Sequence, residues 1–147
     1  MPSKKTCVPR SDCVLSNVLD VFGDKWTLLV VRDLFFFNKH EYKEFLNSPE
    51  AIATNILSDR LKRLAAWGII DETIHPDNKS RKLYYLTPKG KELLPVLFEM
   101  ARWGSKYFPD LKSMQAYYRR IEQDENKLKK VILDTIQKWE KRNLTSD

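Results

Sequence analysis

The hydrophobic residues of this chain recur at a helical spacing over most of its length. A first helical pattern begins after Asp12, a residue that suits a helix N-cap, and stops at Gly23. A second pattern follows Asp24 and is almost wholly apolar as far as Phe36, which predicts a helix buried on several sides at the centre of the fold. The apolar positions of the first helix are Val14, Val18, Val21 and Phe22.

Two further helical patterns follow, joined by a short connection. Residues 41–46 predict a short helix that stops at the Asn-Ser-Pro cluster 47–49, and residues 52–68 predict a second helix that stops at Gly68. A short helix, a tight connection and a longer helix make up a helix-turn-helix. On a helical wheel Ala53, Leu57, Leu61 and Leu64 face the core, whereas Asn55, Ser58, Asp59, Lys62 and Ala66 face solvent.

The solvent side of residues 52–68 has the composition of a DNA recognition helix. Small hydrogen-bonding side chains lie near its start, and two cations, Lys62 and Arg63, lie further along. Short donors and acceptors read base edges, while Lys and Arg bind phosphates. An ordinary amphipathic surface helix has a similar pattern, so the elements that follow decide between the two interpretations.

Beyond Gly68 the hydrophobic period changes from 3.6 to 2. Residues 70–74 and 82–85 alternate between apolar and polar side chains, and the turn-forming sequence HPDNKSR separates them. This pattern predicts a β-hairpin. Its tip carries His75, Lys79, Arg81 and Lys82, and a basic hairpin after a helix-turn-helix is typical of the wing of a winged helix, which reaches a phosphate or the minor groove.

The rest of the chain is predicted to be helical. Thr87 and Pro88 suit the N-cap and first position of a long helix, in which Pro95 predicts a bend, and residues 108–110 end it. Residues 111–147 contain a partial heptad seam, and the cluster EQDEN at 122–126 indicates either an interruption of that seam or a joint between two helices. These apolar faces must be covered by the core or by a second subunit.

These patterns together predict a mainly α fold with a small β-hairpin, an α+β winged helix-turn-helix with an N-terminal helix and a C-terminal helical extension. We expect a basic N-terminal arm at 1–11, which holds Lys4 and Lys5, a DNA-binding domain at 12–108, and a C-terminal extension for dimerisation at 109–147.

Composition excludes several classes of protein. The formal charge of +6 permits a nucleic-acid partner, and no apolar run is long enough for a membrane span or a signal peptide, so we expect a cytoplasmic protein. The two cysteines, Cys7 and Cys13, are then expected to be thiols, and no cysteine or histidine spacing suits a metal. Neither histidine has an acidic partner pattern, and no phosphate-binding glycine loop is present, so we expect neither an enzyme nor a cofactor.

Three stretches resemble the HxlR-type winged-helix transcriptional regulators of bacteria and archaea. They are RSDCVLSNVLDVFGDKWTLLVVRDLFF, IATNILSDRLKRL with the glycine and paired isoleucines after it, and LYYLTPKGKELLPVLFEMARWG, which together span about residues 10–107. The resemblance implies a homodimer, formed through the first and last helices, that reads inverted repeats in double-stranded DNA with half-sites about 34 to 36 Å apart. The DNA-contacting positions that it implies are Thr54, Asn55, Ser58, Lys62, Lys79 and Arg81.

The resemblance also draws attention to Cys13, which stands where the family commonly carries a cysteine. In some members that thiol senses oxidants or electrophiles, and a helix N-terminus favours the thiolate that this chemistry needs. Asp12 opposes ionisation, and the chain has Val14 where the family usually has proline. Two readings therefore stay open for Cys13, a structural thiol and a redox switch.

The sequence thus predicts a sequence-specific DNA-binding regulator, a repressor when it is bound across a promoter. The alternative is a winged helix that docks a protein partner, which Asp59 favours because a carboxylate near phosphates is unfavourable. Arg60 lies towards the buried edge, where an intramolecular ion pair and a phosphate contact are both open. No motif identifies a small-molecule effector.

Overall fold

The structure is a computed structural model that describes residues 9–144 of the 147-residue chain. Lys4, Lys5 and Cys7 of the predicted arm lie outside the described residues. The chain divides after Gly90 into two compact units, which are taken separately below. Residues 94–107, which the sequence analysis assigns to the DNA-binding domain, pack on the C-terminal helix.

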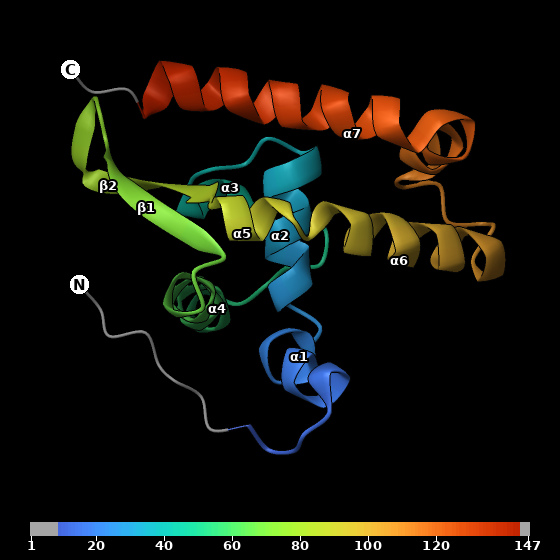
Figure 1. The fold of residues 1–147 in the computed structure, drawn as a ribbon. Coiled ribbons are helices and arrows are strands. Elements are labelled where there is room, and N and C mark those ends of the chain that lie inside the picture. The colour runs from blue at the N-terminus through green and yellow to red at the C-terminus, as the bar shows by residue number, and fades with distance from the viewer. Residues whose placement is uncertain (1–8, 145–147) are drawn as a thin grey trace. The chain divides into compact units, whose positions relative to one another are not determined.

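The first unit is the predicted winged helix-turn-helix (Figure 1). Its central helix carries the buried residues Val30, Val31, Leu34 and Phe35, as its apolar sequence predicts. The hairpin that follows the longest helix of the unit is the wing. The elements are α1 (Val14–Phe22), α2 (Thr27–Phe36), α3 (Tyr42–Leu46), α4 (Thr54–Ala66), β1 (Ile70–His75) and β2 (Asn78–Leu86), followed by α5 (Pro88–Lys91), which spans the division.

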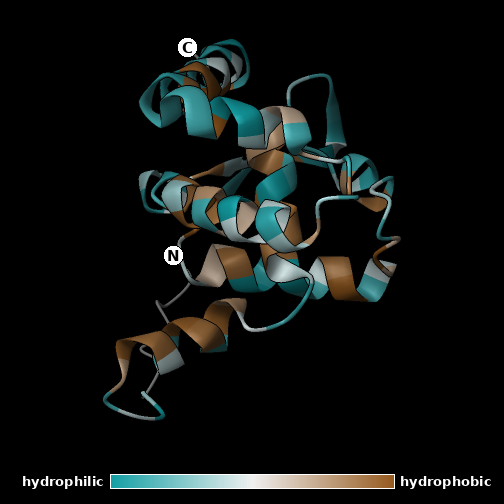
Figure 2. Ribbon diagram, turned by 90° about the vertical axis from the view of Figure 1, so that its right-hand side faces the viewer, coloured by the Kyte–Doolittle hydropathy of each residue, from teal (hydrophilic) through white to brown (hydrophobic). Residues whose placement is uncertain are grey.

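Helix α1 differs from its prediction at its start and in its burial. The N-cap is Cys13, not Asp12, and no side-chain bond caps the helix. Only Val21 is buried, whereas Val14 is 80% exposed and Val18 is also exposed, because α1 packs only a narrow side on the rest of the unit. Figure 2 shows most of this helix in the colour of hydrophobic residues. Gly23 ends the helix as predicted, and its N–H donates to the Leu19 carbonyl at 2.7 Å.

The wing is a two-stranded antiparallel hairpin in which Ile70 pairs with Leu86. Strand β2 begins at Asn78, so most of the sequence expected to form the turn belongs to the strand. The pairing shifts between Ile74 and His75, and Ile74 is 61% exposed rather than turned to the core. A register shift of this kind redirects the side chains on one side of the strand.

The second unit consists of α6 (Leu94–Tyr107) and α7 (Gln115–Asn143), which pack on each other. The predicted bend at Pro95 is wrong, because the chain breaks the helix at residues 92–93 and Pro95 falls in the first turn of α6, where a missing N–H costs no hydrogen bond. Helix α7 is interrupted at Asp124, where φ is −163° and ψ is 92°. This break is the joint predicted as one alternative for residues 122–126.

Five apolar residues of α7 are buried, whereas Leu111, which belongs to the predicted seam, is 62% exposed. No helix in the described part of the chain is long and apolar enough to cross a membrane. The buried residues are Ile121, Leu128, Ile132, Ile136 and Trp139.

Candidate nucleic-acid interface

Helix α4 separates its core side from its solvent side as the sequence predicts. Leu57, Leu61 and Leu64 are buried, and the opposite side is open to solvent. The exception is Ala53, which was expected to face the core but is exposed, because it is the N-cap and its Cβ lies beyond the packed part of the helix. Of the predicted DNA contacts on α4, the structure brings Thr54, Asn55, Ser58 and Lys62 onto this one surface, with Ser58 half-buried and the others exposed.

Tyr42 of α3 holds the first turn of α4. Its hydroxyl donates to the Thr54 carbonyl at 2.9 Å and lies 3.2 Å from the Ser58 hydroxyl. Since Tyr42 also belongs to the short helix of the helix-turn-helix, these bonds fix the angle at which α4 presents its outer surface. Ser58 therefore has a hydrogen-bond partner within the protein as well as a place on the solvent side.

Arg60 is joined to Asp24, which lies shortly before Trp26, the N-cap of α2. Asp24 accepts hydrogen bonds from the backbone N–H groups of Trp26 at 3.0 Å and Thr27 at 3.2 Å, and from Arg60 Nε at 2.8 Å. Partial burial opposes its ionisation, but the bonds from Thr27 and Arg60 outweigh that effect and hold the pKa of the Asp24 carboxyl well below its usual range. The intramolecular ion pair, one of the two alternatives for Arg60, is therefore the one that the structure contains. We call this contact the Asp24–Arg60 pair.

Arg63 lies on the flank of α4 that faces α1. One of its terminal nitrogens donates to the Asp20 carbonyl of α1 at 3.1 Å, and the side chain is half-buried. The structure thus sets Arg63 apart from Asn55 and Lys62, with which the sequence grouped it. Arg63 therefore connects α4 to α1, and Arg60 connects α4 to Asp24 in the segment before α2.

Of the wing's lysines and arginines, Arg81 and Lys82 form ion pairs, whereas Lys79 has none within residues 9–144. Lys79 is exposed, whereas the Arg81 guanidinium forms an ion pair with Glu41, the N-cap residue of α3. His75 Nε2 lies 3.3 Å from the same carboxylate, and Lys82 pairs with Glu72 at 3.0 Å. Glu41 therefore anchors the wing to the helix-turn-helix.

A buried charged cluster, which sequence reasoning missed, holds the connection between α3 and α4. Asp33 is only 2% exposed and accepts a hydrogen bond from the Ser48 hydroxyl at 2.5 Å and from Arg32 at 2.8 Å. Arg32 also pairs with Glu50. The spacing of these residues along the chain gives no signal of the cluster, because it joins the end of α2 to a loop 15 residues away.

Cys13 is exposed at the start of α1. Its backbone N–H donates to the Ser11 hydroxyl at 3.2 Å, and its carbonyl accepts from the Asn17 side chain at 2.7 Å. The thiol is thus at a helix N-terminus, as predicted, but it contributes no packing to a core. Within residues 9–144 the structure shows no group of three His, Cys, Asp or Glu side chains arranged to hold a metal ion.

Comparison with known proteins identifies the family. The model of the HxlR-like helix-turn-helix family matches residues 21–112. An uncharacterized HTH-type transcriptional regulator, sll1512 of Synechocystis sp., is 34% identical over 95 residues, which cover 65% of this chain and 70% of that protein.

Two solved structures resemble this chain over about two thirds of its length. PA1607, described as a transcription factor, is 36% identical with a TM-score of 0.60, and the match covers 67% of this chain and 68% of that one. The redox regulator HypR in its oxidized form is 28% identical with a TM-score of 0.56, and the match covers 64% of this chain and 96% of that one. The chain therefore belongs to the HxlR-like helix-turn-helix family and is a transcriptional regulator of the winged helix-turn-helix class, not an enzyme.

Proposed function

We propose that this regulator acts as a homodimer that binds an inverted repeat in double-stranded DNA and represses transcription when its site overlaps a promoter. The observation that carries the proposal is the outer surface of α4, where Asn55 and Lys62 are exposed on the side away from the buried leucines and Thr54 is exposed in the first turn. Small polar groups and a cation on one rigid, well-braced surface suit a helix that reads base edges in the major groove.

Within this proposal the contacts on α4 have different tasks. Asn55 offers both a donor and an acceptor, the pairing that reads adenine, and Thr54 and Ser58 offer hydroxyls. Lys62 neutralises a phosphate. Arg63 supports α4 through its hydrogen bond to the Asp20 carbonyl of α1. It contacts DNA only if this hydrogen bond breaks.

The wing supplies a test that needs no knowledge of the operator. Lys79→Ala is expected to weaken binding to all DNA sequences alike and to lower the slope of log affinity against log salt by roughly 0.9, because one phosphate contact is lost. Arg81→Ala should lower the slope less, since Glu41 already pairs with that guanidinium. Filter binding over a range of salt concentrations measures both.

Lys25→Ala is the matched control for the wing variants, because this exposed lysine belongs to neither the wing nor α4. It should leave the salt slope unchanged. A slope that is insensitive to Lys79→Ala, or that falls equally in the Lys25 variant, would remove the wing from the interface.

The homodimer is supported by two exposed apolar strips. On α1 the strip contains Leu15 and Leu19, and on α6 it contains Val96, Met100, Trp103 and Tyr107 at helical spacing. Exposed apolar patches on a helix are typical of an interaction surface. The pair of strips agrees with the dimer through the first and last helices that the family resemblance implies, and α7 in this proposal braces α6 from its other side.

A protein-docking role is the second candidate, favoured by the exposed carboxylate of Asp59 on α4. Asp59 forms an ion pair with Arg60, which reduces the repulsion that this carboxylate would exert on a phosphate. Selection of binding sites from a random DNA pool separates the two roles, since only a DNA reader enriches a common sequence.

We further propose that Cys13 makes DNA binding sensitive to oxidants or electrophiles. Its exposure at a helix N-terminus and the resemblance to the redox regulator HypR support this role. Treatment with diamide is expected to lower DNA affinity at least roughly tenfold, in keeping with the usual size of an allosteric effect, and Cys13→Ser should abolish the response. An equal response in the Cys13→Ser variant would show that this thiol is not the sensor.

A further inference from the structure

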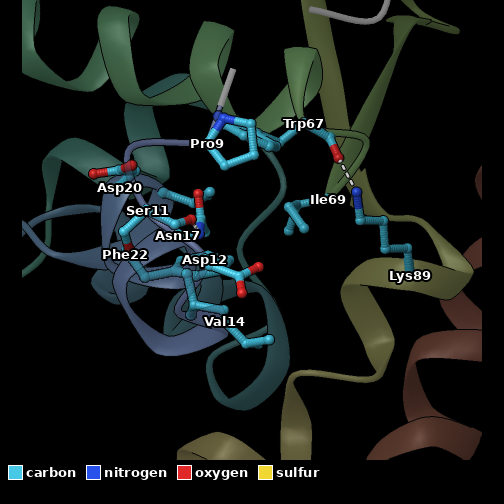
Figure 3. A pocket seen from close by; sticks show the side chains of 12 residues that line it. Pro9, Ser11, Asp12, Val14, Asn17, Asp20, Phe22, Trp67, Ile69 and Lys89 are labelled. Atoms are coloured by element: carbon cyan, nitrogen blue, oxygen red, sulfur yellow. Dashed lines mark hydrogen bonds between the residues drawn. The ribbon is translucent and has the colours of Figure 1, made fainter. Parts of the chain in front are cut away.

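A pocket of about 550 Å³ lies beside α1 in the first unit (Figure 3). Three parts of the chain enclose it: residues 9–12, α1, and the segment after α4 together with Lys89. Its volume is within the range of small-molecule sites. The apolar lining residues are Pro9, Val14, Val18, Val21, Phe22, Trp67 and Ile69.

The charges around the pocket are unequally compensated. The Asp20 carboxylate is 2.6 Å from Arg10 Nε, and the Lys89 ammonium donates to the Trp67 carbonyl at 2.6 Å, where it also faces the negative end of α4. Asp12 has no ion pair among residues 9–144, and its carboxylate points into the space between α1 and Ile69 (Figure 3). An apolar pocket with one unneutralised carboxylate favours a ligand that is apolar and positively charged.

We propose that this pocket binds a small aromatic organic cation. Trp67 and Phe22 supply aromatic surface for the ring of the ligand and for a cation–π contact, and Asp12 supplies the counter-charge. Burial of the ring among the valines and Ile69 provides most of the affinity, and the charge provides the selectivity.

Two of the lining residues, Trp67 and Asp20, are in contact with or part of the end of α4. Trp67 is the C-cap of α4, and Asp20 accepts the hydrogen bond of Arg63 through its carbonyl. A ligand bound between α1 and Trp67 would therefore change the position of α4 relative to α1. The ligand is inferred to be an effector that alters DNA binding, and this second step rests on the proposed function, whereas ligand binding itself does not.

The pocket and the proposed dimer surface use different sides of α1. Leu15 and Leu19 are exposed and do not line the pocket, whereas Val21 and Asn17 line it. Helix α1 can therefore contact a second subunit through one side and a ligand through the other.

Three probes of one shape test the pocket by calorimetry on the whole chain without DNA. They are 2-naphthylmethylammonium, 2-naphthylmethanol and 2-naphthoate, which differ in charge at nearly constant size. The ammonium is expected to bind roughly tenfold more tightly than the alcohol, and the carboxylate most weakly. Asp12→Asn should remove the preference for the cation, while Asp71→Asn, which neutralises an exposed carboxylate on the wing, should retain it. Quenching of tryptophan emission by the ammonium should decrease in Trp67→Phe.

Several results would overturn the proposal. Absence of binding by all three probes at millimolar concentration would remove the site, and tighter binding of the naphthoate, or an unchanged preference in Asp12→Asn, would remove the assigned charge. Dissociation of a dimer by the ammonium in sedimentation experiments would assign the pocket to a second copy of the chain.

The coupling to DNA binding is tested by measuring DNA affinity with and without saturating ammonium. Unchanged affinity would refute the coupling, while the DNA binding of the ligand-free protein tests the proposed function by itself.

Discussion

Trp103→Glu is expected to convert the dimer to a monomer, with a dissociation constant raised by roughly 100-fold or more. Trp103 is 63% exposed in the single chain. Because tryptophan is among the residues that contribute most to protein interfaces, we expect this side chain to be buried in the dimer. A carboxylate at this position would have to be buried in the dimer without a partner. Affinity for a DNA site with two half-sites should decrease in parallel, because a dimer gains avidity from binding both. Sedimentation velocity over a concentration series measures the first effect.

Ile74→Glu is the control for oligomeric state, because Ile74 is exposed to a similar degree, 61%, but belongs to the wing. It should leave the dimer intact. Leu15→Glu places the same change on α1 and should also dissociate the dimer. A dimer of unaltered affinity in both the Trp103 and the Leu15 variants would contradict the assignment of the two strips, whether or not each variant binds DNA.

The second large effect is expected from Arg60→Gln, compared with Lys62→Gln on the same helix. Arg60→Gln breaks the Asp24–Arg60 pair and should lower the free energy of unfolding by about 1–2 kcal/mol, since both groups are largely shielded from solvent. Specific DNA affinity should decrease as α4 loses its support, but the salt slope should not change. Lys62→Gln should do the opposite, with stability retained, affinity lowered and the salt slope reduced by roughly one counterion.

The ionisation of Asp24 sets the pH range of this comparison. Because its pKa in the folded protein is lowered, the pair stabilises the fold at pH values above the ordinary carboxyl pKa and is lost only as the pH falls through the lowered value. Chemical denaturation at neutral pH therefore measures the full effect. If Arg60→Gln reduced the salt slope as Lys62→Gln does, Arg60 would be a phosphate contact and not a support of α4.

The elements of this fold could be predicted because each has a local cause. The helical spacing of Leu57, Leu61 and Leu64 follows from burial on one side and is present in the structure. The predicted hairpin also forms, although Ile74 is exposed. The short helix α3 and the break at Asp124 also lie within stretches whose composition indicated them.

The contacts that position the reading surface could not be predicted, because they join residues far apart in the sequence. Arg60 reaches Asp24 across 36 positions and Arg81 reaches Glu41 across 40. The helical wheel places Arg60 towards the buried edge of its helix, but the local sequence identifies neither its partner nor that of Arg81. The side of α1 that stays exposed was missed for a related reason, since periodicity shows that a helix has an apolar side but not whether this chain or a second one covers it.

Selection of binding sites from a random oligonucleotide pool by the purified 147-residue chain tests whether the protein is a dimeric DNA reader. An inverted repeat with half-sites about one helical turn, or 34 to 36 Å, apart is expected to be enriched. Asn55→Ala should change the enriched half-site, while Lys79→Ala should leave its sequence unchanged. A pool that stays at the level of non-specific binding would contradict a dimeric DNA reader and would favour the protein-docking role.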